Sequence, residues 1–212
     1  MRSLFLALVA AAACGAQQGG GNPAAIFDKI YSNPAPPFNP EPSAFLARAV
    51  EGLTPGKALD AAMGQGRNSL LLARKGWDVT GYDVSSVGLE TARRSAEQAG
   101  VKINTVLKDH RTFDFGTEKW DLIVLVFPLL SMDEEDVMRR IKASLKPGGT
   151  IVVEQFNSMP GPGSKGPANA LFRTFQEYRV VRYEDVEDTS DWGRMKARIG
   201  RIAAVKEGAS TR

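Results

Sequence analysis

The sequence predicts an α/β fold, in which a parallel sheet is covered by helices on both faces. Short apolar runs of β-like composition recur along the chain, and helical patterns separate most of them. The run LIVLV at 122–126 is continuous enough for a central strand that is buried on both faces. With 212 residues and 43% hydrophobic content, the chain is long enough for one globular domain with a sizeable core.

The first residues have the layout of a secretory signal peptide. Arg2 gives a positive start, and the apolar stretch that follows is too short to span a bilayer. Cleavage after Ala16 would leave small residues at the cut, whereas AAAC is a weak lipoprotein signal in which Cys14 would carry the lipid. We expect residues 1–16 to be a signal peptide and the protein to be periplasmic or secreted. An ordinary apolar helix in a cytoplasmic protein is the alternative.

Residues 17–42 are expected to form a linker and an irregular N-terminal arm, because Gly, Pro and Asn recur in QQGGGNPAA and YSNPAPPFNPEP. The domain proper is expected to cover residues 43–207. A helix opens it, because PSAFLARAVEGL places apolar residues at helical spacing. Ser43 is suited to cap its start, and Gly52 lies near its end.

An alternation of strands and helices follows. Strands are expected at 58–63, 78–84, 103–109, 120–127 and 150–156, each bounded by Gly, Pro or charge. Helices are expected at 67–75, 86–99 and 133–145. The last helix begins with acidic residues and continues with basic ones, which suits the helix dipole.

The pattern changes after residue 156. A Gly/Pro-rich loop, NSMPGPGSKGP, leads into a helix around Leu171, Phe172 and Phe175. The strands YRVVRYE and ARIGRIAAVK follow, joined by a polar connection without a helix. Such a pair is expected to close the sheet as an antiparallel hairpin.

A ligand site is expected at the carboxyl ends of the parallel strands. The loop AMGQGRN follows the first of them, where Gly64 and Gly66 allow a tight turn and a close approach of ligand to backbone. Two glycines alone are equally typical of a plain turn. Acids recur at three successive strands, as Asp60, Asp83 and Asp109. Asp83 stands where an acid accepts the hydroxyls of a ribose, with a helix cap as the alternative.

On these residues, the chain from about 26 to 206 resembles the class I S-adenosylmethionine-dependent methyltransferases, in particular the small-molecule types of the tellurite-resistance and thiopurine families. LDAAMGQG is similar to the family loop D-x-G-x-G-x-G, and LKPGGTIVVE is similar to its turn and fifth strand. The resemblance implies a Rossmann-like seven-stranded sheet of order 3-2-1-4-5-7-6, with strand 7 antiparallel and helices on both faces.

The resemblance also implies S-adenosyl-L-methionine as the cofactor. Asp60 and the loop would then hold its amino-acid part, Asp83 its ribose and Asp109 its adenine amino group, with His110 beside the ring. The cofactor-binding residues expected on this basis are Asp60, Ala62, Met63, Gly64, Gly66, Asp83, Val84, Asp109, His110 and Phe127. Ala62 departs from the family, which usually has a glycine there. If the position needs a positive φ, alanine costs roughly 1 to 2 kcal/mol.

The site residues that would act on the substrate are left open. A sulfonium methyl is already activated, so its transfer by in-line displacement needs positioning and exclusion of water rather than a catalytic triad. Tyr31, Phe38 and Glu154 are candidates for the substrate side; the alternatives are docking on the sheet edge for the two rings and a salt bridge for the acid. His110 is either a general base or a loop residue beside adenine, and Phe127 either stacks near the methyl or fills the core.

Methyl transfer to a small nucleophile is the expected function, for example to a thiol, a selenium or tellurium species, a halide or an oxygen acid. VFPL lacks the amide and tyrosine of the NPPY motif of amino-methylating relatives. An NAD(P)-dependent oxidoreductase is one alternative, although Ser69 stands in the place of its third glycine. A non-catalytic cofactor-binding module is another.

Composition argues against other classes of partner. The formal net charge is +3, with both signs mixed in almost every segment, so nucleic acid is not expected. One cysteine and one histidine exclude a disulfide framework and a metal site built from these residues. We expect a small-molecule substrate, no membrane partner unless Cys14 is lipidated, and a monomer or dimer.

Overall fold

The computed structural model describes residues 22–36, 38–128, 130, 132, 134–157 and 167–208. The expected signal peptide with Cys14 lies outside the described residues. So do Asp133, at the start of an expected helix, and most of the Gly/Pro-rich loop that begins at Asn157.

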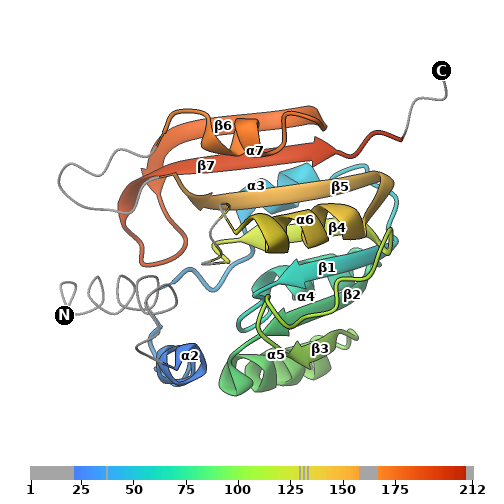
Figure 1. Ribbon diagram of the computed structural model, residues 1–212. Helices are drawn as coiled ribbons and strands as arrows, with labels where there is room; N and C mark the ends of the chain where they lie inside the picture. The colour runs from blue at the N-terminus through green and yellow to red at the C-terminus, as the bar shows by residue number, and fades with distance from the viewer. Residues whose placement is uncertain are drawn as a thin grey trace.

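A single seven-stranded sheet runs through the molecule (Figure 1). In chain order its strands are β1 (Lys57–Ala61), β2 (Asp78–Asp83), β3 (Asn104–Leu107), β4 (Trp120–Val126), β5 (Leu145–Phe156), β6 (Arg179–Thr189) and β7 (Lys196–Val205). In space they are ordered β3-β2-β1-β4-β5-β7-β6, and β7 is antiparallel to both β5 and β6. The predicted fold class, strand order and closing hairpin are confirmed.

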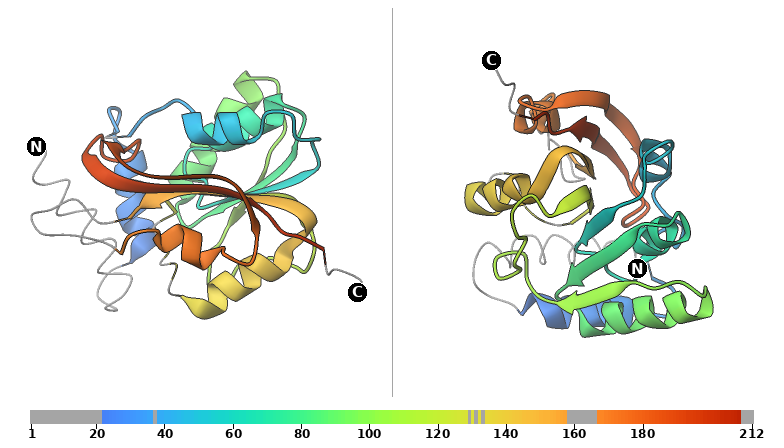
Figure 2. Two further views of the ribbon diagram at one scale, coloured as in Figure 1. Left: turned by 90° about the horizontal axis from the view of Figure 1, so that it is seen from above. Right: turned by 90° about the vertical axis from the view of Figure 1, so that its right-hand side faces the viewer.

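Helices cover both faces of the sheet, as Figure 2 shows from above. On one face lie α3 (Ala44–Ala49), α4 (Arg67–Arg74) and α5 (Ser86–Gln98), and on the other lie α6 (Glu135–Ser144) and α7 (Ala170–Thr174). The apolar residues of α6, which the sequence predicted as a helix at 133–145, are buried against the sheet; they include Val137 and Ile141. Ser43 caps α3 as predicted, because its Oγ accepts the N–H of Leu46 at 3.1 Å.

The expectation of an irregular N-terminal arm is wrong for residues 23–31, which form helix α2 (Pro23–Tyr31). Pro23 lies at the first helical position, where its missing N–H is no loss. Asn22 caps the helix by accepting the N–H of Ala24 at 3.1 Å. Asn22 and Pro23, which are residue types typical of turns, therefore start a helix here.

Helix α2 packs against α5 (Figure 1). Asp28 makes the junction specific, because its Oδ1 accepts Ser85 Oγ at 2.6 Å and the N–H of Val87 at 3.2 Å. A carboxylate at the start of α5 also suits the positive end of that helix dipole. The N-terminal helix is thus attached beside the carboxyl end of β2.

The topology fixes where a ligand site can form. β1 pairs in parallel with β2 on one side and with β4 on the other, so the order in which successive strands join the sheet reverses at β1. Ligands of open α/β sheets bind at this switch point, outside the carboxyl ends of the strands. Ala62, Asp83, Asp109 and Phe127 all lie at that edge.

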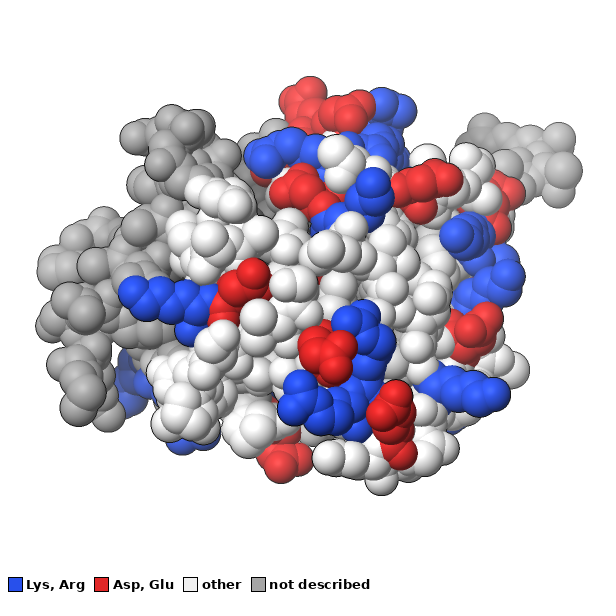
Figure 3. All heavy atoms as spheres, turned by 90° about the horizontal axis from the view of Figure 1, so that it is seen from below, with Lys and Arg blue, Asp and Glu red and all other residues white. Residues whose placement is uncertain are grey.

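None of the helices formed by the described residues has the length and apolar character needed to cross a membrane. Acidic and basic side chains lie next to one another on the face seen from below in Figure 3.

Candidate functional site

Two cavities meet at the carboxyl ends of the strands. The first, here called the acid cavity, is lined by Asp83, Val84, Asp109 and His110 among others. The second, the loop cavity, is lined by Met63, Gly64, Gln65 and Arg67 among others. Both cavities share four lining residues, namely Tyr31, Ala62, Phe127 and Trp192. The two spaces therefore adjoin along these four residues, here called the shared wall, of which three are aromatic.

The glycine loop takes a left-handed backbone at three positions. Ala62, Gly64 and Gly66 have φ values of 54°, 53° and 79°. A side chain at position 64 would meet Tyr31 Oη at 2.6 Å, and one at position 66 would meet Ala92 Cβ at 2.8 Å. Glycine is thus required at both positions, by conformation and by close packing.

The backbone of Ala62 is strained, because this residue has a positive φ and is not glycine. This is the case in which the sequence analysis expected alanine to be costly. We expect Ala62→Gly to raise the free energy of unfolding by about 1 kcal/mol, since relief of left-handed strain exceeds the added freedom of glycine in the unfolded chain. Urea denaturation followed by circular dichroism measures it. Ala61→Gly, one residue earlier within β1, should destabilise instead. A loss of stability in Ala62→Gly would refute the strain.

Asp83 ties the loop to the end of β2. Its Oδ2 accepts the N–H of Gly64 at 2.8 Å, and its Oδ1 accepts the N–H of Ser85 at 2.8 Å. Burial raises the pKa of this carboxyl to about 6, although the backbone hydrogen bonds act in the opposite direction. A carboxylate accepts about four hydrogen bonds, so acceptor capacity remains toward the acid cavity that Asp83 lines.

Asp60 lies behind the loop and lines neither cavity. It is buried, and its Oδ2 accepts the hydroxyl of Ser69 at 2.6 Å, which joins β1 to the first turn of α4. Burial raises its pKa to about 6. Its place in the structure makes it a positioning residue of the loop. Gly66 also lies outside both cavity walls.

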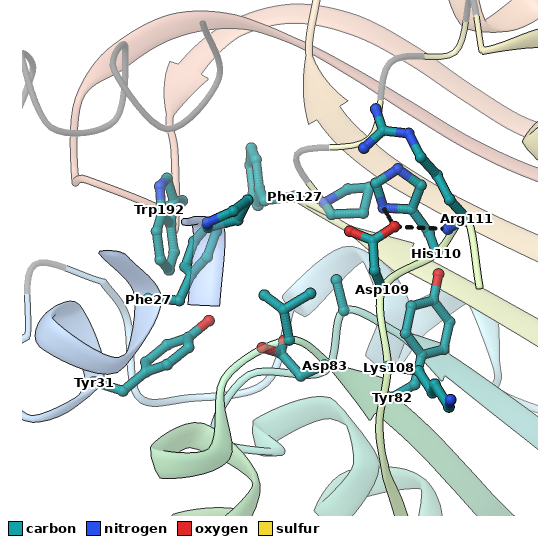
Figure 4. Close-up of a pocket in the computed structure, with 14 residues that line it drawn as sticks. Phe27, Tyr31, Tyr82, Asp83, Lys108, Asp109, His110, Arg111, Phe127 and Trp192 are labelled. Carbon is teal, nitrogen blue, oxygen red and sulfur yellow. Dashed lines mark hydrogen bonds and ion pairs between the residues drawn. The ribbon is translucent and has the colours of Figure 1, made fainter. Parts of the chain in front are cut away.

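Asp109 and His110 form the wall opposite α2, as Figure 4 shows. Asp109 Oδ1 accepts the N–H of Arg111 at 2.8 Å. His110 Nδ1 lies 3.9 Å from Asp109 Oδ1, and its Nε2 lies 3.4 Å from Glu134 Oε2. His110 therefore lies beside Asp109 on the same wall of the acid cavity, and it does not line the loop cavity.

An aromatic cluster closes the other side of the site, and Figure 4 shows three of its members, Phe27, Tyr31 and Trp192. It consists of Phe27, Tyr31, Phe38 and Trp192, which come from α2, from the segment after it and from the tip of the β6–β7 hairpin. Phe38 and Trp192 stack at 5.2 Å between ring centroids, and Tyr31 meets both rings edge-on. Burial raises the pKa of the Tyr31 hydroxyl well above its ordinary value, so this phenol is neutral at physiological pH.

Among the candidates for the substrate side, the structure places Tyr31 and Phe38 on cavity walls and Glu154 elsewhere. Glu154 is buried at the end of β5, where it accepts Ser43 Oγ at 2.5 Å and Arg201 Nε at 2.7 Å. It lines neither cavity and lies in the salt bridge that was its alternative. Phe127, with a positive φ of 49°, lines both cavities and packs on Phe156.

Several lining residues were not singled out from the sequence. Phe27 and Trp192 line the acid cavity, and Arg67 lines the loop cavity. Arg67 follows Gly66 directly, so its place in the loop was a usable signal. Trp192 lies in a polar turn far along the chain, and no local pattern connects it to the loop.

Comparison with known proteins agrees with this geometry. Residues 58–149 match a family model described as a methyltransferase domain. The chain is 32% identical over 134 residues to a ubiquinone biosynthesis O-methyltransferase of Pasteurella multocida, an alignment that covers 57% of this chain and 54% of that protein. The chain thus spans about half the length of these curated relatives.

Solved structures show the same fold. TehB from Haemophilus influenzae superposes with a TM-score of 0.64 at 24% identity, covering 87% of this chain and 67% of that one. A magnesium protoporphyrin IX methyltransferase of Synechocystis, solved with bound SAH, superposes with a TM-score of 0.59 at 17% identity, covering 76% and 80%. The matching domain and the curated relatives favour a methyltransferase over the oxidoreductase alternative. The chain therefore carries a methyltransferase domain over residues 58–149, which contain the glycine loop, Asp83 and Asp109, and it is similar to proteins named S-adenosylmethionine-dependent methyltransferases.

Proposed function

We propose that this protein binds S-adenosylmethionine across the two cavities and transfers its methyl group to a small nucleophile. The observation that carries the proposal is that Asp83 and Asp109, at the ends of neighbouring strands, line one cavity beside the glycine loop. Asp83 has acceptor capacity for ribose hydroxyls, and Asp109 offers an acceptor for an adenine amino group. The amino-acid part then extends toward the loop cavity.

The shared wall of the two cavities suits the reacting centre. The cofactor, when bound, supplies a methyl group on a positively charged sulfur. Tyr31, Phe127 and Trp192 present aromatic rings there, which stabilise a cation and keep water out. The protein contributes mainly by holding nucleophile and methyl in line.

The shared wall also indicates the class of acceptor. Its four residues are Tyr31, Ala62, Phe127 and Trp192, and none of them is a base at neutral pH. An acceptor that carries its own reactive lone pair in water meets this condition. Thiols, selenium or tellurium species, halides and oxygen acids belong to this class.

Incubation of the purified protein with isotopically labelled S-adenosylmethionine and one acceptor from each class tests the proposal. We expect tight binding by calorimetry and transfer of label to at least one acceptor. Binding without transfer to any of them would favour a non-catalytic cofactor-binding module. Absence of both binding and transfer would refute the proposed function.

Cofactor affinity should depend on pH, because Asp60 and Asp83 both have pKa values of about 6. These carboxyls hold protons below that pH, whereas a cationic ligand favours the ionised forms. Affinity for S-adenosylmethionine should therefore fall as the pH drops below about 6, by up to about tenfold per pH unit for each group that must ionise. Calorimetry at pH 5.0, 6.0 and 7.5, chosen to bracket about 6, measures it. Asp83→Asn should flatten the profile, and an unchanged profile would contradict this coupling.

We also propose that residues 1–16 direct export, on the strength of their charge and apolar layout. Cell fractionation and N-terminal sequencing of the mature protein test this. A mature chain that starts at Met1 in the cytoplasm would refute it, and a lipid on Cys14 would favour the lipid-anchored alternative.

We also propose that the protein is a monomer or dimer, which gel filtration tests. Its proposed partners are small molecules rather than nucleic acid.

A further inference from the structure

We propose that Asp191 is a positioning residue that holds the tip of the β6–β7 hairpin closed over the site, an assignment that rests on the proposed function. Asp191 directly precedes Trp192, which lines both cavities and is 8% exposed. A group that fixes the backbone beside this ring fixes one side of the enclosure. Ligands would then enter and leave when the tip opens.

Asp191 is tied to two segments that lie far from it in the chain. Its Oδ2 accepts Arg67 Nη1 at 2.8 Å, and Arg67 is the first residue of α4. Its Oδ1 accepts Asn39 Nδ2 at 3.1 Å, and its carbonyl oxygen accepts the N–H of Asn39 at 2.8 Å. These three residues, here called the latch, join the hairpin tip to the segment after α2 and to a helix of the core.

The latch continues into the aromatic cluster. Phe38 and Trp192 form an antiparallel bridge, and their rings stack at 5.2 Å between centroids. Arg67 Nη1 also donates to the backbone oxygen of Glu41 at 2.6 Å. The side chains of Arg67 and Asp191 are 17% and 21% exposed, so salt and water screen their ion pair only in part. Charge-assisted hydrogen bonds therefore reinforce the ring contacts of the closed tip.

The cavities are small while the tip is closed. The acid cavity measures about 70 Å³ and the loop cavity about 220 Å³, each below the roughly 300 Å³ at which ordinary ligand sites begin. Part of the enclosure must therefore move to admit a ligand of nucleoside size. Helix α2 is fixed to α5 through Asp28, whereas Trp192 lies in the turn between two strands. The turn can move with the smaller loss of packing.

The release of S-adenosylhomocysteine from the full-length protein, followed by stopped-flow fluorescence, reports the opening of the tip. We expect Asp191→Ala to speed release about tenfold, as for the loss of one shielded charge-assisted hydrogen bond. Asp188→Ala is the matched control, because it removes an ion pair of the same length from the same hairpin, with Arg201 of the sheet as partner. Its release rate should equal that of the wild type.

A measurement without ligand detects the tip directly. The three tryptophans of the chain, Trp77, Trp120 and Trp192, are 5%, 2% and 8% exposed, so acrylamide should quench the fluorescence of the wild type only weakly. Asp191→Ala should raise the quenching constant, because Trp192 meets solvent when the tip opens. The rise should vanish in Asp191→Ala/Trp192→Phe. A general loss of stability would not confine the change to this one ring.

A reversible cross-link tests the movement in a single protein. Asn39 and Asp191 face each other beside the bridge of Phe38 and Trp192, and opposed residues of this kind have Cα atoms roughly 5.5 Å apart, which a disulfide can span. In a Cys14→Ser background, the oxidised form of Asn39→Cys/Asp191→Cys should release the ligand no faster than the wild type. Reduction should produce the fast release of Asp191→Ala.

The outcomes separate this inference from the proposed function. If folded Asp191→Ala lacks either the faster release or the stronger quenching, the latch is overturned and cofactor binding stands. Equal acceleration in Asp188→Ala, or equal release from the oxidised and reduced cysteine variant, would overturn it too. If circular dichroism shows that Asp191→Ala does not fold, Asp191→Asn decides by the same measurements. A wild type that does not bind S-adenosylhomocysteine would refute the proposed function, and the quenching experiment would still decide whether Asp191 holds the tip.

Discussion

Replacing Asp83 by alanine is expected to weaken the binding of S-adenosylmethionine by about two to four orders of magnitude. Two charge-assisted hydrogen bonds to ribose hydroxyls are worth about 1.5 to 3 kcal/mol each in a shielded site. The substitution also removes the acceptor of the Gly64 N–H, which holds the glycine loop against β2. Both effects act on the same cavity, and isothermal calorimetry at pH 7.5, above the raised pKa of about 6, measures their sum.

Two further variants make the result interpretable. Asp78→Ala changes an exposed acid at the opposite end of the same strand and should leave affinity unchanged. Asp83→Asn keeps one carbonyl acceptor without the charge and should fall between wild type and alanine. A folded Asp83→Ala protein with wild-type affinity would contradict the assignment of the acid cavity.

Glu154→Ala is expected to lower the free energy of unfolding by about 3 kcal/mol, near the lower end of the cost of breaking a buried ion pair. The side chains of Glu154 and Arg201 are 4% and 12% exposed, so the partner left behind is poorly solvated. Arg201 keeps contacts with Glu184 and Asp188, which limits the loss. Urea denaturation at pH 7 measures the change.

The same variant decides between two interpretations of Glu154. Because this side chain lines neither cavity, the affinity for S-adenosylmethionine should be unaltered. Glu187→Ala, on the exposed part of β6, should change stability by no more than about 0.5 kcal/mol. Unchanged stability together with lost methyl transfer would restore Glu154 to the substrate side.

Local patterns in the sequence predicted much of the fold. The run from Leu122 to Val126 is apolar because β4 is covered on both faces, and its composition shows this directly. The spacing of Gly64 and Gly66 predicted a tight turn, and both residues have a positive φ. A backbone turn depends on near neighbours in the chain and is therefore visible in it, whereas the contacts of these glycines with Tyr31 and Ala92 are not.

The N-terminal helix was missed because its stability comes from contacts rather than from its own composition. Pro23 and Asn22 are read as breakers unless they stand at a helix start. Ile30 is buried against residues that lie much further along the chain. Asp28 gains its partners from α5, more than fifty residues later. No window of the sequence contains these interactions.

The walls of the site were only partly predictable for the same reason. Asp83 and Asp109 were found because strand ends of a parallel sheet always meet at one edge. Trp192 reaches that edge only because the hairpin of β6 and β7 folds back and Phe38 pairs with it. Glu154 was ambiguous, since the sequence does not show that Arg201 faces it across β5 and β7.

The pairing of Phe38 with Trp192 has a consequence for biosynthesis. The strands and loop that carry Asp83 and Asp109 are translated before β6 and β7. The tryptophan that encloses them lies between those two later strands. A nascent polypeptide that still lacks β6 and β7 therefore has both acids but no enclosure around them, and it acquires a water-free site only when this hairpin has been made.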